Sequence, residues 1–139
     1  MSKRFLNPPS LFSSEQYGFS QIAEVRGGTT IYLAGQVAWN PEKEIEGPGH
    51  LGVQATAALN NIERALAEVG GNRCDVVAMR IYIRNDYIHD DTPVQEALKG
   101  FFAPGSLPVS TWIGVAALAH PDFLVEIEAT AVIDDLPAT

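Results

Sequence analysis

Two stretches of the chain carry apolar residues at the spacing of an amphipathic helix. The first extends from Leu51 to Val69, and Gly70-Gly71 follows it, as glycine commonly does where a helix ends. The second begins at Thr92, a candidate N-cap, with Pro93 in the first helical position. The apolar stripe that this helix would bury consists of Val94, Ala97, Leu98, Phe101 and Phe102.

Five further stretches have the composition or the alternation of β-strands. They cover residues 18–25, 29–36, 76–84, 110–118 and 124–133, with room for one short strand before them. Gly27-Gly28 tolerates positive φ and predicts a hairpin between the first two strands. The order β-β-α-β-α-β-β predicts a single α+β domain over residues 1–139, in which two helices cover one face of a mostly antiparallel sheet.

The second face of this predicted sheet is not covered by the helices. Its charged residues are Arg80, Arg84, Glu126 and Glu128. We expect the same face to carry three larger side chains, those of Tyr82, Trp112 and Leu118. An antiparallel sheet commonly shows one polar face to water. The mixture of aromatic and charged side chains favours a contact between subunits instead.

Charge and composition narrow the range of functions. The chain has nine Lys and Arg residues against 17 Asp and Glu, a net charge of −8, and no basic run. Nucleic acids and anionic membranes bind through basic residues, so we expect neither as a partner. The single cysteine, Cys74, excludes an internal disulfide framework. Because the N-terminus resembles no secretory signal and no apolar stretch is long enough to span a bilayer, we expect a cytoplasmic protein.

The residue patterns of several common catalytic, metal-binding and nucleotide-binding sites are missing from this sequence. No histidine has the spacing that would activate a serine, and no Cys/His cluster has the spacing of metal ligands. The chain has neither a P-loop nor a Rossmann glycine pattern. We therefore expect no bound metal. Trp39 and Trp112 leave two alternatives open: stacking on an aromatic ligand, or burial by packing or at an interface, which is the commoner case.

Several segments together resemble the RidA/YjgF family, a family that also carries the label endoribonuclease L-PSP. These segments occur in the family's order and are Gly18–Gln21, Ile31–Gln36, Gln54–Gly70, Phe101-Phe102, Gly114–Leu118 and Val125–Ala129. The resemblance implies the family's chorismate-mutase-like fold and a homotrimer that binds small molecules in clefts between subunits. It also implies the hydrolysis of reactive enamines and imines, such as 2-aminoacrylate, to 2-keto acids and ammonia without a cofactor.

The resemblance also suggests which residues form the site. The family's Gly-Gln pair is present as Gly35-Gln36, and its carboxylate is present as Glu126, which we expect to position water or transfer a proton. Thr111 and Trp112 follow the family's substrate-binding position and are expected to line the cleft.

Four positions depart from the family's pattern. Its usual tyrosine is Phe19 here, its serine before Gly-Gln is Ala34, and its helical asparagine is Gln95. The signature P-A-R reads Pro108-Val109-Ser110, which places Ser110 in the arginine's position. All four of these positions remain candidate substrate-binding residues.

The loss of the arginine has the largest consequence. A guanidinium grips a carboxylate with two N–H donors, whereas a serine hydroxyl offers one neutral donor. Losing one partner of a buried charged pair costs about 2–5 kcal/mol. Arg80 and Arg84 are the available replacements, although we favour their pairing with Glu126 and Glu128 across the strands.

Two functions remain open from the sequence. One is a cofactor-free hydrolase of an imine, an enamine or a related nitrogen compound other than 2-aminoacrylate. The other is a trimer that binds a small metabolite without catalysis, as a sensor or modulator. The acidic charge argues against ribonuclease activity.

Overall fold

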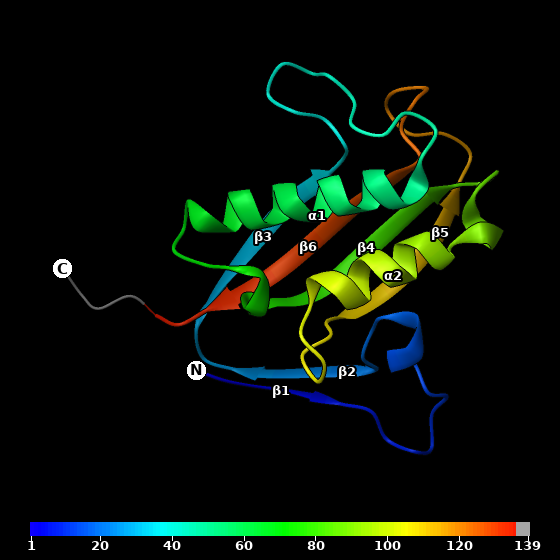
Figure 1. Cartoon of the computed structure of the whole chain (residues 1–139). Coiled ribbons are helices and arrows are strands. Elements are labelled where there is room, and N and C mark those ends of the chain that lie inside the picture. Colours follow the sequence, from blue (N-terminus) through cyan, green and yellow to red (C-terminus); the bar gives the residue numbers. More distant parts are fainter. Residues whose placement is uncertain (136–139) are drawn as a thin grey trace.

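The computed structural model describes residues 1–135 and has two long helices on one side of a sheet (Figure 1). This arrangement confirms the predicted α+β class and the mostly antiparallel sheet, in which the pairing of β4 with β5 is parallel. The helices are α1 (Leu51–Ala67) and α2 (Thr92–Phe101), and three single 3₁₀ turns lie at Glu15–Tyr17, Arg73–Asp75 and Ile88–Asp90. The strands are β1 (Ser2–Leu6), β2 (Ile22–Arg26), β3 (Thr29–Gln36), β4 (Val76–Arg84), β5 (Val109–Val115) and β6 (Val125–Ile133).

The strands form two separate sheets. The main sheet has the order β3-β6-β4-β5, in which only β4 and β5 are parallel. The predicted hairpin between the segments before and after Gly27-Gly28 is wrong, because β2 pairs with β1 and β3 pairs with β6. Both glycines do adopt positive φ, but their turn leads the chain from the small β1-β2 ribbon into the main sheet. A turn signal fixes the local backbone and not the partner of the strand that follows.

Several predicted boundaries move by a few residues. The strand expected from residue 18 begins at Ile22, since Gly18, at φ 94°, ends the 3₁₀ turn before it. Thr92 is the first residue of α2 rather than its N-cap, which is Asp91 and makes no side-chain capping bond. The strand expected over residues 110–118 ends at Val115, so Leu118 lies beyond it. None of these shifts changes the order of the elements.

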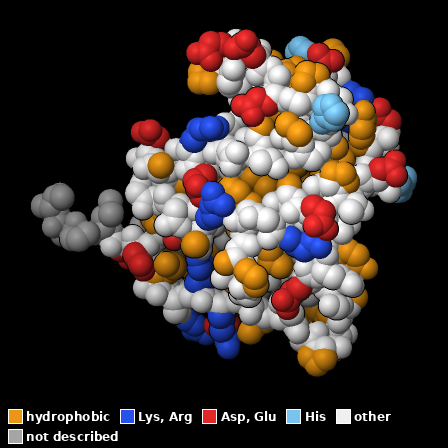
Figure 2. All heavy atoms as spheres, in the orientation of Figure 1, with side chains coloured by type: hydrophobic (Ala, Val, Ile, Leu, Met, Phe, Trp, Pro, Cys, Tyr) orange, Lys and Arg blue, Asp and Glu red, His pale blue; other side chains and the backbone are white. Residues whose placement is uncertain are grey.

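Charges of both signs are interspersed over the helix side of the molecule (Figure 2). Within residues 1–135, six of the nine basic side chains lie close to a carboxylate: Arg4, Arg26, Arg73, Arg80, Arg84 and Lys99. Paired cations are poorly placed to neutralise phosphates. The helices of this described part are too short or too polar to cross a membrane.

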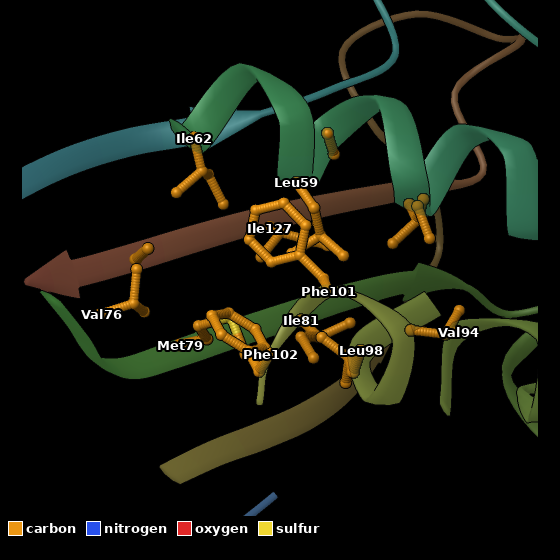
Figure 3. Close-up of a cluster of buried hydrophobic side chains, with 14 of the residues drawn as sticks. Leu59, Ile62, Val76, Met79, Ile81, Val94, Leu98, Phe101, Phe102 and Ile127 are labelled. Carbon is orange, nitrogen blue, oxygen red and sulfur yellow. The ribbon is translucent and has the colours of Figure 1, made fainter. Parts of the chain in front are cut away.

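The core lies between the two helices and the main sheet (Figure 3). Alternation along β4 and β6 sends Ile81 and Ile127 toward the helices, where both are fully buried. Leu59 and Ile62 of α1 and Leu98 of α2 close over them and are equally buried. Each such side chain stabilises the fold by about 1.5–3 kcal/mol through burial. This packing leaves the opposite face of the sheet without a helix.

One fully buried polar residue ties α1 to the loops at its N-terminal end. The Gln54 amide donates to the carbonyl oxygens of Gly47 (3.2 Å) and Asp122 (2.9 Å). Its Oε1 accepts the backbone N–H of Leu124 at 2.9 Å. The side chain thereby satisfies one backbone group in the loop before α1 and two just before β6, the strand that carries the candidate carboxylate.

Candidate functional site

The uncovered face of the sheet carries a row of polar side chains. Strand register places Thr111 of β5, Arg80 of β4 and Glu128 of β6 side by side. In the same way, Tyr82 of β4 lies opposite Glu126 of β6. These positions alternate with core residues, so they point away from the helices. The face is therefore polar in its centre and open in the single chain.

Glu126 lies directly against the backbone of β3. A Cβ added at Gly35 would lie 2.2 Å from Glu126 Oε2, so the carboxylate fills the space that any other residue would need. The register of β3 on β6 is irregular between Leu33 and Gln36, which brings Gly35 under this side chain. Glycine at position 35 is thus a requirement of the carboxylate's placement.

The two glutamates of this face differ in their partners. Glu128 accepts a hydrogen bond from the Tyr82 hydroxyl at 3.1 Å and lies 3.6 Å from Arg80. The hydrogen bond to this carboxylate raises the pKa of Tyr82. No ion pair or side-chain hydrogen bond within residues 1–135 engages the carboxylate of half-buried Glu126. Glu126 is therefore the carboxylate of this face that is free to act on a ligand.

The two arginines have separate roles. Arg80 meets Glu128 across the strands, as expected. The same expectation is wrong for Arg84, whose guanidinium binds Asp86 at 2.7 and 2.9 Å and the carbonyl of Pro121. Arg84 is the last residue of β4, where the chain turns back and brings Asp86 within reach. Arg80 is the arginine that remains beside the candidate site.

A hollow of about 590 Å³ opens over this row and extends across the sheet from β3 to β5. Its lining brings together Phe19, Ser110 and Thr111, which the sequence predicted, and Arg80 and Glu128. Tyr32, which is 82% exposed, also borders it. Tyr32 was not predicted as a site residue, because nothing in the sequence of β3 shows which strand lies beside β3.

Trp112 lies on the helix-covered face of the sheet and not on the open face predicted for it. Its register partner is Ile81, a core residue, and its ring packs against the core beneath the helices. The indole N–H donates to Ser110 Oγ at 2.9 Å, so this hydroxyl already has a partner. The prediction failed because the phase of the short, weakly alternating β5 segment was assigned wrongly.

A second hollow, of about 610 Å³, lies between β5 and the N-terminal end of α2. It contains the predicted residues Gln95 and Trp112, and it shares Phe19, Ser110 and Thr111 with the first hollow. The Gln95 amide donates to Asp91 Oδ1 at 3.0 Å. Its other aromatic residues, Phe12 and Tyr17, lie between β1 and β2, and no pattern in that segment predicts them as site residues.

The predicted site residues therefore fall into two groups within one chain. Phe19, Gln95, Ser110, Thr111 and Trp112 surround the two hollows that meet at β5. Ala34, Gly35 and Gln36 lie on β3, at the opposite edge of the sheet, with Glu126 beside them on β6. Gln36 lines a different hollow with Trp39 and Asn61, and its amide donates to the Ala34 carbonyl at 3.2 Å.

Residues 1–135 contain no cluster of three or more His, Cys, Asp or Glu side chains arranged to hold a metal ion. The arrangement offers instead a carboxylate, an arginine with its partner glutamate, and aromatic walls. Groups of these kinds are common where proteins bind organic ligands and transfer protons.

Comparison with known proteins places this arrangement in a family. The chain is 32% identical over 116 residues to the 2-iminobutanoate/2-iminopropanoate deaminase of Dermatophagoides farinae, covering 84% of this chain and 86% of that protein. It is 35% identical over 114 residues to the Mus musculus protein of the same name, covering 82% and 80% of the two chains. Among solved structures, the Rid-family protein YyfB of Yersinia pestis superposes with a TM-score of 0.89 at 35% identity, covering 96% of this chain and all of that one. A sequence model of the family described as Endoribonuclease L-PSP matches residues 14–133, so the chain belongs to this family, the RidA/YjgF family that its segments resemble.

Proposed function

We propose that this protein hydrolyses an imine or enamine without a cofactor, in clefts between the subunits of a homotrimer. The observation that carries the proposal is the Glu126 carboxylate, which lies against Gly35 on the open face with no partner among the described residues. The relatives named as iminobutanoate/iminopropanoate deaminases support the reaction class.

In the proposed reaction, water adds to the carbon of the C=N bond, and an enamine first tautomerises to the imine. Glu126 takes a proton from water as the water attacks the protonated imine, which forms a carbinolamine with a neutral amino group. The protonated carboxyl then gives this proton to the nitrogen, and the resulting carboxylate accepts the proton of the carbinolamine hydroxyl as the C–N bond breaks and the C=O bond forms. The products are a carbonyl compound and ammonia, and no electrons are gained or lost. A positioned carboxylate in this role accelerates proton transfer by about 100- to 10,000-fold.

The separation of the two residue groups supports a site built between subunits. Within one chain, β4 lies between Glu126 on β6 and Ser110 on β5, and Glu126 lines neither of the two hollows that contain Ser110. A second copy docked on the open face brings one group from each chain together. The exposed ring of Tyr32 and the mixed polar surface around it suit such a contact.

We expect the protein to behave as a trimer in solution. Multi-angle light scattering at micromolar concentration should give a mass of about three subunits, because the proposed site is complete only across a subunit contact. A mass near that of one subunit would contradict both the trimer and the shared site.

We expect little or no activity on 2-aminoacrylate. Ser110 replaces the family's arginine and its hydroxyl already accepts from Trp112, while Phe19 and Ala34 remove two further hydroxyls. When 2-aminoacrylate is generated in situ, its decay should stay close to the uncatalysed rate. Ser110→Arg should raise this rate by about tenfold or more, as expected for a regained charged pair.

Two outcomes of that experiment would contradict the role given to the missing arginine. Rapid decay with the wild-type protein would show that the arginine is dispensable, with Arg80 as the replacement to test. A trimeric Ser110→Arg variant that gains nothing would place the deficit elsewhere in the site.

The second candidate function is a trimer that binds a small metabolite without catalysis. The departures at Phe19, Ala34 and Ser110 favour it, because each removes a polar group that the family uses on its substrate. Ribonuclease activity is disfavoured by the net charge of −8 and by the pairing of most basic side chains with carboxylates.

A further inference from the structure

Aromatic rings form the walls of the hollow between β5 and α2. Phe12 and Tyr17 come from the segment before β2, Phe19 follows the 3₁₀ turn, and Trp112 comes from β5. Phe12 and Phe19 meet edge to face, with ring centroids 6.1 Å apart. Phe12 is 64% exposed and Tyr17 is 42% exposed in the single chain. Such exposure of large rings around one hollow is typical of a binding surface.

The aromatic hollow is continuous with the candidate site. It shares Phe19, Gln21, Ser110 and Thr111 with the neighbouring hollow that contains Arg80 and Glu128. A ligand that reacts beside Ser110 therefore has the aromatic walls next to it. The far end of the hollow carries the Asp91 carboxylate, which disfavours an anionic group there. The neighbouring hollow holds Arg80, which lies 3.6 Å from Glu128.

The size and lining of the hollow define its ligand. At about 610 Å³, it lies within the range of pockets that hold drug-sized molecules and is far larger than a three-carbon imino acid requires. Aromatic walls gain most from another ring, through stacked and edge-to-face contacts. The Ser110 hydroxyl accepts a hydrogen bond from Trp112 and is a weak partner for a small carboxylate. The hollow therefore offers a ligand mainly apolar contact.

We propose that this hollow receives an aromatic substituent, so that the substrates are imines or enamines that carry an aromatic ring. The inference rests on the proposed hydrolysis and specifies the class of compound on which it acts. Phe12, Tyr17 and Phe19 then determine specificity by contact with the ring, while Glu126 transfers the proton.

The test compares imines produced in situ by an L-amino-acid oxidase from phenylalanine, tryptophan, leucine and alanine. Semicarbazide traps the free imine, and a hydrolase lowers the rate at which the semicarbazone forms. We expect hydrolysis of the two aromatic imines to exceed that of the aliphatic ones by about tenfold or more, as two or three ring contacts would give.

Matched variants tie the preference to the hollow. Phe12→Ala should lower the ratio of aromatic to aliphatic rates by about 2- to 10-fold, the value of one aromatic contact. Leu11→Ala is the control, because Leu11 is adjacent and exposed but does not line the hollow. Both residues lie on the surface, so neither change threatens the core.

A binding measurement separates the failure of this inference from that of the proposed function. Phenylpyruvate should quench the tryptophan fluorescence at lower concentrations than pyruvate does, because Trp112 lines the hollow, and Phe12→Ala should weaken this binding. Equal hydrolysis of aromatic and aliphatic imines would overturn the aromatic preference and leave the hydrolase intact. Tight binding of phenylpyruvate without hydrolysis of any imine would overturn the hydrolase and identify an aromatic-binding protein. If phenylpyruvate does not bind and aromatic imines are not preferred, the assignment of the hollow to an aromatic substituent is wrong.

Discussion

Replacement of Glu126 by glutamine is expected to lower imine hydrolysis by about 100-fold or more, the usual contribution of a positioned proton-transfer group. Glutamine preserves the size of the side chain but can neither accept a proton from water nor return it to the nitrogen. The measurement is kcat/KM on the best imine found for the wild-type protein. The loss should appear in kcat, since the residue acts in the transition state.

Glu68→Gln is the matched control, because Glu68 lies exposed at the end of α1, away from the candidate site. It should retain the wild-type rate. Gly35→Ala should lose activity to a similar degree, since its Cβ occupies the position of Glu126 Oε2 and displaces the carboxylate. A Glu126→Gln protein that turns over at the wild-type rate would remove Glu126 from the mechanism.

Replacement of Gln54 by leucine is expected to destabilise the fold by about 2–6 kcal/mol. The change leaves the buried Leu124 N–H without its partner, at about 1–3 kcal/mol, and removes the hydrogen bonds to the part-buried carbonyls of Gly47 and Asp122, at about 0.5–1.5 kcal/mol each. This is a large fraction of the stability of a typical domain. Thermal unfolding should shift down by about 10 °C or more.

Gln16→Leu provides the comparison for this variant, since Gln16 is an exposed glutamine that bonds only the Ser13 carbonyl. Its unfolding temperature should change little. If Gln54→Leu unfolds at the wild-type temperature, water or rearranged loops must satisfy the three backbone groups. The hydrogen bonds of Gln54 would then contribute little to the free energy of unfolding.

The candidate site was predictable in its residue types and not in its geometry. Glu126 and Gly35 were expected because their segments resemble those of the family, and both lie on the strands predicted for them. Nothing in either segment showed that the carboxylate packs on the glycine, because that contact depends on the register between β3 and β6. Arg80 became the cation beside Thr111 through the parallel register of β4 on β5.

The elements with strong periodicity were predictable from the sequence alone. The long apolar stripe of α1 and the clean alternation of β4 and β6 gave the class, the order and the buried face, because periodicity records which side of an element meets the core. The partners of these elements came from the folded chain: β2 pairs with β1, Trp112 packs beneath the helices, and four aromatic rings line one hollow beside β5. These features depend on contacts between distant segments, and a local pattern carries no information about which segment will lie beside it.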